Sequence, residues 1–134
     1  MNKRYLTPAQ IYYSLANLRQ ITFEVTDACN LKCKYCGYGE FYDDYDRRSN
    51  KMMPFTMAKQ AINYLIPFWQ SPANMSADKN VYISFYGGEP LMNMELIQQV
   101  VHYKEGLHLE NRHYTFSMTN NAMLLDKVTS KLTY

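Results

Sequence analysis

The sequence predicts an α/β protein built around a parallel sheet, with about three strand-then-helix units. Three short segments rich in β-branched and aromatic residues each lead towards a stretch with helical spacing. This alternation favours a parallel sheet with right-handed crossovers, in which ligands bind at the carboxyl ends of the strands. All three cysteines of the chain fall at one such end, in the loop after the first predicted strand.

The predicted elements follow one another in a regular order. A short helix is expected from Pro8 to Leu18, with Thr7 as its cap and a proline in its first turn. The predicted strands are Gln20 to Thr26, Val81 to Tyr86 and Tyr114 to Met118. The helices that follow them are Thr56 to Trp69, Met94 to Glu105 and Leu125 to Leu132. We therefore divide the chain into an N-terminal extension, residues 1–19, and the βα units, residues 20–134.

Two residues are expected to limit these helices. Pro67 should kink or end the helix that contains it, because proline lacks an N–H and crowds the preceding turn. Gly106 should end the next helix.

Composition excludes several classes of protein. The chain is 47% hydrophobic and 19% charged, which is typical of a globular domain. Its formal net charge of +2 is too small to imply a nucleic-acid or anionic membrane partner. The longest apolar run is far shorter than a membrane span, and the first twenty residues lack the apolar core of a signal peptide. We expect a cytoplasmic protein.

Cys29, Cys33 and Cys36 form a C-x3-C-x2-C motif. An odd number of cysteines argues against a closed disulfide framework, and in a reducing compartment clustered cysteines favour a metal site. Three thiolates can hold three irons of a four-iron cluster and leave the fourth iron open to a substrate or cofactor. Zinc is the main alternative, but its fourth ligand would have to come from His102, His108 or His113, and none of these forms a spaced pair with another cysteine.

A glycine-rich segment, Gly87-Gly88-Glu89-Pro90, follows the second predicted strand. Gly87 and Gly88 allow the backbone to approach a ligand closely. Pro90 biases Glu89 towards an extended conformation, and the Glu89 carboxylate adds an acceptor for a positively charged group. Together these features suit recognition of an ammonium group.

A polar segment, Thr119-Asn120-Asn121, follows the third predicted strand. Asn120, or Ser117 within the strand, is a candidate for neutral hydrogen bonds to a polar ligand. Because the strands are expected to be parallel, all three segments should meet at one edge of the sheet.

Taken together, the cysteine motif, with Tyr35 just before its last cysteine, and the later Gly-Gly-Glu-Pro segment resemble the radical S-adenosylmethionine (radical SAM) superfamily. The context is similar to its peptide- and protein-modifying branch, which includes the anaerobic sulfatase-maturing enzymes. Thr26 to Leu31 resembles that branch's lead-in to the cysteines, and Ser117 to Leu125 resembles its third strand and the stretch after it. The resemblance covers about residues 20 to 126.

The resemblance implies a role for each matching residue. The three cysteines would ligate a [4Fe–4S] cluster whose open iron chelates S-adenosylmethionine, and Gly87, Gly88 and Glu89 would contact its amino group. Pro90, Ser117 and Asn120 complete the expected cofactor-binding set. An electron from a donor such as flavodoxin or ferredoxin would cleave the cofactor reductively and start radical modification of a peptide or protein. The sequence assigns no side chain as a general acid or base.

The chain departs from the family pattern in two ways. The family's glycine after Thr-Asn is Asn121 here, a residue that tolerates a left-handed backbone better than most. The family's partial (β/α) barrel has six units, and this chain has about three, so we expect an N-terminal fragment of an enzyme that does not turn over a substrate by itself. The alternatives are a radical SAM enzyme acting on a small molecule, a non-catalytic iron–sulfur or zinc-binding module, and an inactive truncated fragment.

Overall fold

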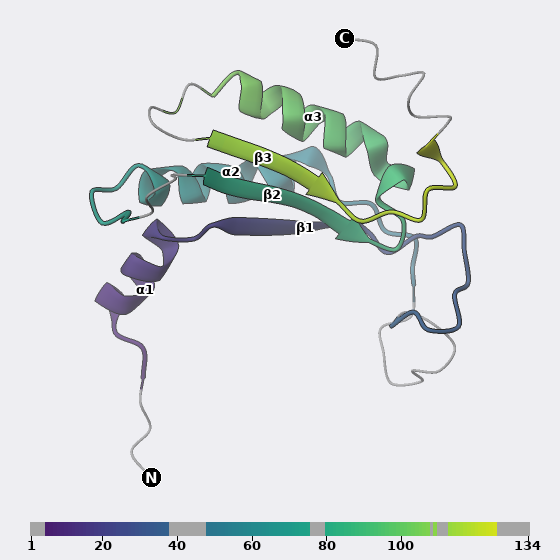
Figure 1. Cartoon of the computed structure of the whole chain (residues 1–134), viewed down its shortest axis with the longest axis horizontal. Helices are drawn as coiled ribbons and strands as arrows, with labels where there is room; N and C mark the ends of the chain where they lie inside the picture. Colours follow the sequence, from purple (N-terminus) through teal and green to yellow (C-terminus); the bar gives the residue numbers. More distant parts are fainter. Residues whose placement is uncertain (1–4, 38–47, 76–79, 108, 110–112, 126–134) are drawn as a thin grey trace.

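A computed structural model describes residues 5–37, 48–75, 80–107, 109 and 113–125 of the chain. Its elements, in order, are α1 (Pro8–Ala16), β1 (Gln20–Thr26), α2 (Phe55–Trp69), β2 (Asn80–Gly87), η1 (Pro90–Asn93), α3 (Met94–Glu105) and β3 (His113–Met118) (Figure 1). The predicted strands and the first three predicted helices are all present, and a short 3₁₀ turn, η1, was not predicted. Apart from its first residue, the helix expected from Leu125 to Leu132 lies outside the described residues.

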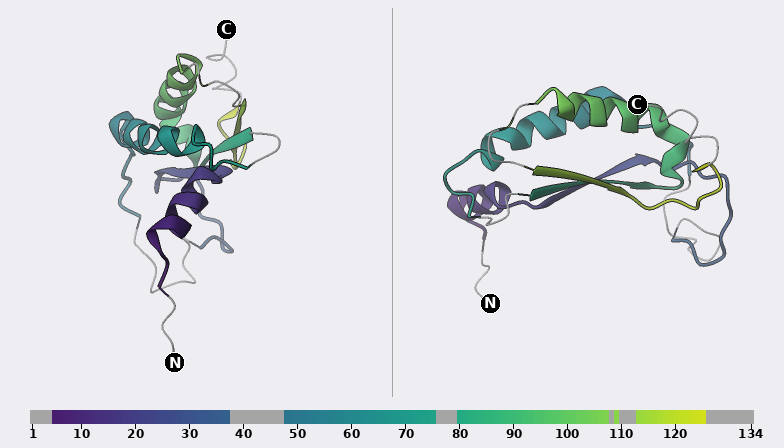
Figure 2. Two further views of the ribbon diagram at one scale, coloured as in Figure 1. Left: turned by 90° about the vertical axis from the view of Figure 1, so that its left-hand side faces the viewer. Right: turned by 45° about the horizontal axis from the view of Figure 1, so that its top comes forward.

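The three strands form one parallel sheet in the order β1-β2-β3. Ile21 pairs with Ile83 on β2, and Ile83 in turn pairs with Phe116 on β3. The parallel α/β architecture predicted from the sequence is therefore confirmed. Because the strands run in the same direction, the segments that follow them meet at one edge of the sheet, as the views of Figures 1 and 2 show.

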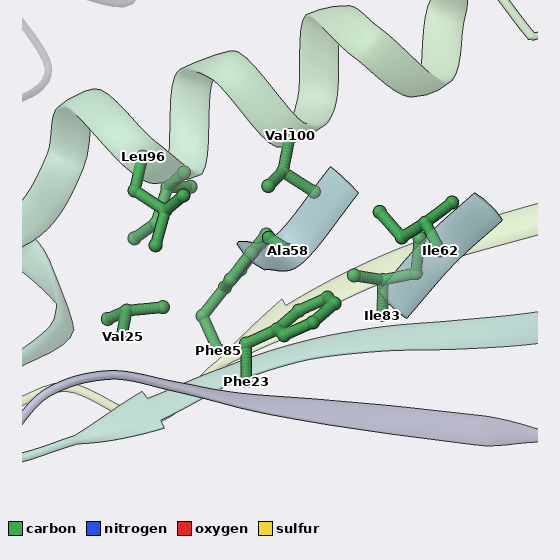
Figure 3. Close-up of a cluster of buried hydrophobic side chains, with 9 residues drawn as sticks. Phe23, Val25, Ala58, Ile62, Ile83, Phe85, Leu96 and Val100 are labelled. Atoms are coloured by element: carbon green, nitrogen blue, oxygen red, sulfur yellow. The ribbon is translucent and has the colours of Figure 1, made fainter. Parts of the chain in front are cut away.

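Both long helices cover the same face of the sheet. α2 and α3 lie side by side across β1, β2 and β3, with the hydrophobic core between the two layers (Figures 2 and 3). Burying these apolar side chains provides the main driving force for the arrangement. The main cluster of this core consists of Phe23, Val25, Ala58, Ile62, Ile83, Phe85, Leu96, Ile97 and Val100.

The opposite face of the sheet is polar. Gln20 Nε2 donates to Thr22 Oγ1 at 3.2 Å and to Ser84 Oγ at 3.1 Å. Ser84 Oγ and Ser117 Oγ are 2.8 Å apart and share a hydrogen bond. In the part of the chain that the structure describes, no helix lies across this face (Figure 2). The alternation of apolar and polar residues along each strand separates a buried face from a face suited to polar ligands.

The ends of the helices follow local chemistry. Thr7 caps α1 in a capping box with Gln10, in which each side chain accepts a hydrogen bond from the other residue's backbone N–H. Pro67 lies in the last turn of α2, and the helix continues to Trp69 before it ends. The expectation that Pro67 kinks or ends the helix is thus met only two residues later: the proline has no N–H to donate, but Gln70 N still donates to Ile66 O at 3.0 Å. Gly106 is the C-cap of α3, as predicted.

Candidate iron–sulfur site

The loop that carries the cysteines is closed at its base by Asp27, which follows β1. Asp27 Oδ2 accepts hydrogen bonds from Ser49 N at 2.7 Å and Ser49 Oγ at 2.9 Å, and Oδ1 accepts one from Lys51 N at 2.7 Å. The Ser49 backbone N–H, with help from its hydroxyl and the Lys51 N–H, holds the pKa of Asp27 below its ordinary value, although desolvation opposes the shift. Residues at the two ends of a long loop are thereby joined.

The returning limb of this loop also pairs with the end of β1. Met53 N donates to Val25 O at 2.9 Å, and Thr26 Oγ1 donates to Lys51 O at 2.8 Å. Asn93, at the end of η1, donates through Nδ2 to Val25 O at 2.8 Å and to Met53 O at 3.2 Å. The base of the loop is therefore fixed to both β1 and η1.

Cys29, Cys33 and Cys36 lie in this loop as free thiols, each partly exposed. Leu31 N donates to Cys29 Sγ at 3.4 Å, and Cys36 N donates to Cys33 O at 3.1 Å. Within the described residues, no three His, Cys, Asp or Glu side chains form a group that would hold a single metal ion. A cluster has a different requirement, because each thiolate binds a separate iron, and three free thiols in one loop are a suitable donor set for it.

Two side chains close to the cysteines carry charge or titrate. Arg48 donates from Nη2 to Cys36 Sγ and from Nη1 to Leu31 O, both at 3.4 Å. Tyr35 is 89% exposed, and a side-chain hydrogen bond with Cys33, reinforced by the negative charge of Cys33 and Cys36, raises its pKa. A guanidinium group thus contacts Cys36, and a phenol lies close to Cys33.

The glycine segment after β2 lies against the backbone that leads into the cysteine loop. Gly88 N donates to Thr26 O and Glu89 N donates to Ala28 O, both at 2.8 Å. A Cβ atom on Gly87 would lie 2.1 Å from Thr26 O, and one on Gly88 would lie 2.2 Å from Ala28 O. We expected these glycines to allow close approach of a ligand. The structure shows a second role, because a side chain at either position would collide with the backbone of Thr26 or Ala28.

Glu89 is fully buried, which the sequence did not indicate. Its backbone is extended, as Pro90 predicts, but its carboxylate is 0% exposed. Oε1 accepts from Leu91 N at 2.9 Å, and Oε2 accepts from Asn121 N at 2.7 Å. Each carboxylate oxygen thus accepts one backbone hydrogen bond and keeps a further acceptor position, so the expected contact of Glu89 with a positively charged ligand group stays a prediction. Its backbone remains the part that lies beside the cysteine loop.

The segment after β3 also uses its side chains internally. Asn120 Oδ1 accepts from Ala122 N at 2.9 Å, and Ser117 Oγ, within β3 itself, shares its hydrogen bond with Ser84. Asn121 Nδ2 donates to Asn30 Oδ1 at 2.8 Å and lies 3.9 Å from Cys29 Sγ. The residues predicted after the three strands are thus brought to one edge of the sheet.

The left-handed backbone expected at Asn121 lies one residue later. Ala122 has a φ of +65°, whereas Asn121 is not among the non-glycine residues with positive φ. The Asn121 side chain is used for contact with the cysteine loop, and the following residue makes the turn. The expectation that a left-handed backbone explains asparagine at this position is therefore wrong, and the side-chain contact with Asn30 explains it instead.

Sequence reasoning missed three residues of the site: Asp27, Arg48 and Asn121 as a side-chain donor. Asp27 had a usable signal, because a carboxylate directly after a strand often accepts backbone N–H groups of a returning loop. Arg48 had none, since the contact joins residues that are 12 positions apart in the sequence.

Comparisons with known proteins agree with this geometry. A family model described as a 4Fe-4S single cluster domain matches residues 18–133. An uncharacterized protein of Methanocaldococcus jannaschii is 33% identical over 116 residues, which are 86% of this chain and 35% of that protein. The radical SAM cyclopropyl synthase TigE of Paramaledivibacter caminithermalis is 30% identical over 122 residues, covering 86% of this chain and 25% of the synthase.

A more distant relative is the cysteine-type anaerobic sulfatase-maturating enzyme of Clostridium novyi. It is 22% identical over 118 residues, covering 84% of this chain and 28% of the enzyme. The matches thus span between 25% and 35% of the length of these three relatives. No helix among the described residues is both long and apolar enough to cross a membrane.

Proposed function

Because the chain belongs to the family of 4Fe-4S single cluster domains and is related to radical SAM enzymes, we propose that its three cysteines hold one [4Fe–4S] cluster with an open iron. That iron binds S-adenosylmethionine. Cys29, Cys33 and Cys36 each supply one thiolate. The bound cluster and cofactor supply reductive cleavage of a carbon–sulfur bond, which starts radical chemistry on a substrate.

One observation carries this proposal. The Gly88–Glu89 backbone is hydrogen-bonded to the backbone of Thr26 and Ala28, directly before the first cysteine. Two motifs that are about 50 residues apart in the sequence therefore lie against each other. A purely structural metal site would not need the second motif at this place, whereas a site that binds both a cluster and an amino acid-like cofactor needs polar backbone groups beside the cluster.

The residues of the chain divide the work. The cysteines hold the cluster, and the backbone of Gly87, Gly88 and Glu89, followed by Pro90, offers polar groups to the cofactor's amino group. The buried Glu89 carboxylate holds the segments after β2 and β3 together by accepting a backbone hydrogen bond from each. We expect Ser117 and Asn120 to contribute neutral hydrogen bonds once the cofactor is bound.

We further propose that the chain acts on a peptide or protein substrate in the cytoplasm, and that its parallel sheet forms part of a partial (β/α) barrel. Support comes from the name of one relative, a sulfatase-maturating enzyme. Support also comes from the polar face of the sheet, which lies on the side away from α2 and α3 and is suited to line the interior of a barrel. The electron is proposed to come from a flavodoxin or ferredoxin.

Anaerobic reconstitution tests the proposal. The chain is loaded with iron and sulfide, reduced with dithionite in the presence of S-adenosylmethionine, and assayed for 5′-deoxyadenosine. We expect 5′-deoxyadenosine from the native chain and from Lys34→Ala, a change of an exposed residue in the same loop. Cys33→Ala should give none. Equal product from native chain and Cys33→Ala, or tight binding of one zinc ion without iron uptake, would refute the proposal.

A further inference from the structure

We infer that Arg48 is a positioning residue that sets the reduction potential of the cluster. The inference rests on the proposed function, because it concerns the same three cysteines. Arg48 lies outside the cysteine motif, yet its guanidinium group donates to the sulfur of Cys36 and to the carbonyl oxygen of Leu31. A planar group with donors on two ends is suited to span two such acceptors.

The two acceptors place Arg48 across the motif. Leu31 O lies between the first and second cysteines, and Cys36 is the last. The guanidinium group therefore joins the stretch between the first two cysteines to the last cysteine. The distance of 3.4 Å from Nη2 to Sγ is an ordinary one for a donor to the large sulfur atom, whereas 3.4 Å from Nη1 to a carbonyl oxygen marks a weaker bond.

The backbone next to Arg48 is anchored. The following residue, Ser49, donates twice to the carboxylate of Asp27, and Lys51 donates once more. Asp27 itself directly follows β1. The backbone that carries Arg48 is thus held beside the end of β1. Because this backbone is already ordered, less conformational entropy is lost when the arginine side chain contacts the cysteine loop.

A permanent positive charge with an N–H aimed at a cluster ligand has a definite effect. Reduction adds negative charge to the cluster, and a nearby cation stabilises the reduced form more than the oxidised form. Hydrogen bonds to the ligating sulfurs act in the same direction. Arg48 is therefore expected to raise the potential and so make reduction of the cluster easier.

A second donor near the cysteines provides a useful contrast. Asn121 Nδ2 lies 3.9 Å from Cys29 Sγ, and its short hydrogen bond, at 2.8 Å, goes to Asn30 instead. It is neutral, and its contact with sulfur is longer. The difference assigns the electrostatic role to Arg48 and not to Asn121.

The test is an EPR-monitored redox titration of the reconstituted chain, which reads the midpoint potential independently of activity. The variants are Arg48→Gln and Arg48→Lys, and the matched control is Lys32→Gln, which removes one positive charge from an exposed side chain of the same loop. We expect the potential to become more negative in the order native, Arg48→Lys, Arg48→Gln. Lys32→Gln should remain close to native.

Several outcomes would overturn the inference. One is a native potential in both Arg48 variants, and another is an equal shift in Lys32→Gln and Arg48→Gln. A third is loss of the cluster from both Arg48 variants, which would mean that Arg48 is needed for assembly of the cluster and not for its potential. If Arg48→Gln alone takes up no cluster, Arg48→Lys decides, and a native potential there overturns the inference. Failure of the native chain itself to take up a cluster would instead refute the proposed function.

Discussion

The buried carboxylate of Glu89 accepts a 2.7 Å hydrogen bond from the backbone N–H of Asn121, and this joins the segment after β2 to the segment after β3. The side chain of Asn121 then continues to Asn30 in the cysteine loop. The segments that follow all three strands are therefore connected through two side chains. A site assembled from three loops gains from such a connection, because the position of each loop depends on the others.

Replacing Glu89 by Gln should destabilise the fold while keeping the size of the side chain. A glutamine amide has only one acceptor atom, so one of the two N–H donors, from Leu91 or Asn121, would be left unpaired in a buried place. We expect a loss of about 1–3 kcal/mol in the free energy of unfolding, measured by chemical denaturation of the metal-free chain. Glu95→Gln, on the exposed surface of α3, should change it by less than about 0.5 kcal/mol. Equal effects would contradict the role assigned to Glu89.

Gly88→Ala should disturb the cysteine loop as well as the segment after β2. The added Cβ would lie 2.2 Å from the carbonyl oxygen of Ala28, so backbone must move next to the first cysteine. We expect lower iron uptake on reconstitution, and faster hydrogen–deuterium exchange at Gly88 and Glu89. Gly37→Ala is the matched control, because a Cβ there would meet nothing within 4 Å. Native iron uptake in Gly88→Ala would show that the close approach is not needed.

Asp27→Asn should loosen the base of the cysteine loop. The neutral amide keeps one acceptor oxygen, whereas the carboxylate now accepts from Ser49 N, Ser49 Oγ and Lys51 N. Hydrogen–deuterium exchange should become faster at the amides of Ser49 and Lys51, while core amides of β2 keep their protection. Glu105→Gln, which neutralises an exposed carboxylate at the end of α3, should leave the exchange rates of both amides unchanged. Unchanged exchange in Asp27→Asn would contradict the closure described here.

Ala122→Gly should stabilise the fold slightly or leave it unchanged, although glycine usually destabilises. Ala122 has a φ of +65°, where an L-residue with a Cβ carries roughly 1 kcal/mol of strain. That gain offsets the entropy that a glycine loses on folding. The same change at Ala61, inside α2, should lose about 1 kcal/mol. Denaturation of both variants compares the two, and a loss of similar size at Ala122 would be inconsistent with the left-handed turn.

Much of the fold was predictable from the sequence. The strand segments alternate apolar and polar residues, so the buried face with Phe23 and Phe85 and the polar face with Ser84 follow from periodicity. The place of the three cysteines after β1 follows as well, because parallel strands bring their carboxyl ends together.

The contacts that organise the site were less predictable. The burial of Glu89 depends on Asn121, a residue 32 positions later on another strand's loop, and no local pattern signals such a pair. Arg48 contacts Cys36 across 12 positions of the sequence, and no periodic pattern of residues indicates that contact. The glycines were related to a ligand because the sequence does not show that the backbone of Ala28 passes beside them.

The central claim is that Cys29, Cys33 and Cys36 hold one [4Fe–4S] cluster with an iron open to S-adenosylmethionine. EPR spectra of the reconstituted, reduced chain with and without S-adenosylmethionine test it most directly. The account predicts about four irons per chain and a cluster signal that changes when the cofactor is added, because the cofactor binds the open iron. A chain that takes up zinc but no iron, or a cluster signal identical with and without the cofactor, would contradict it.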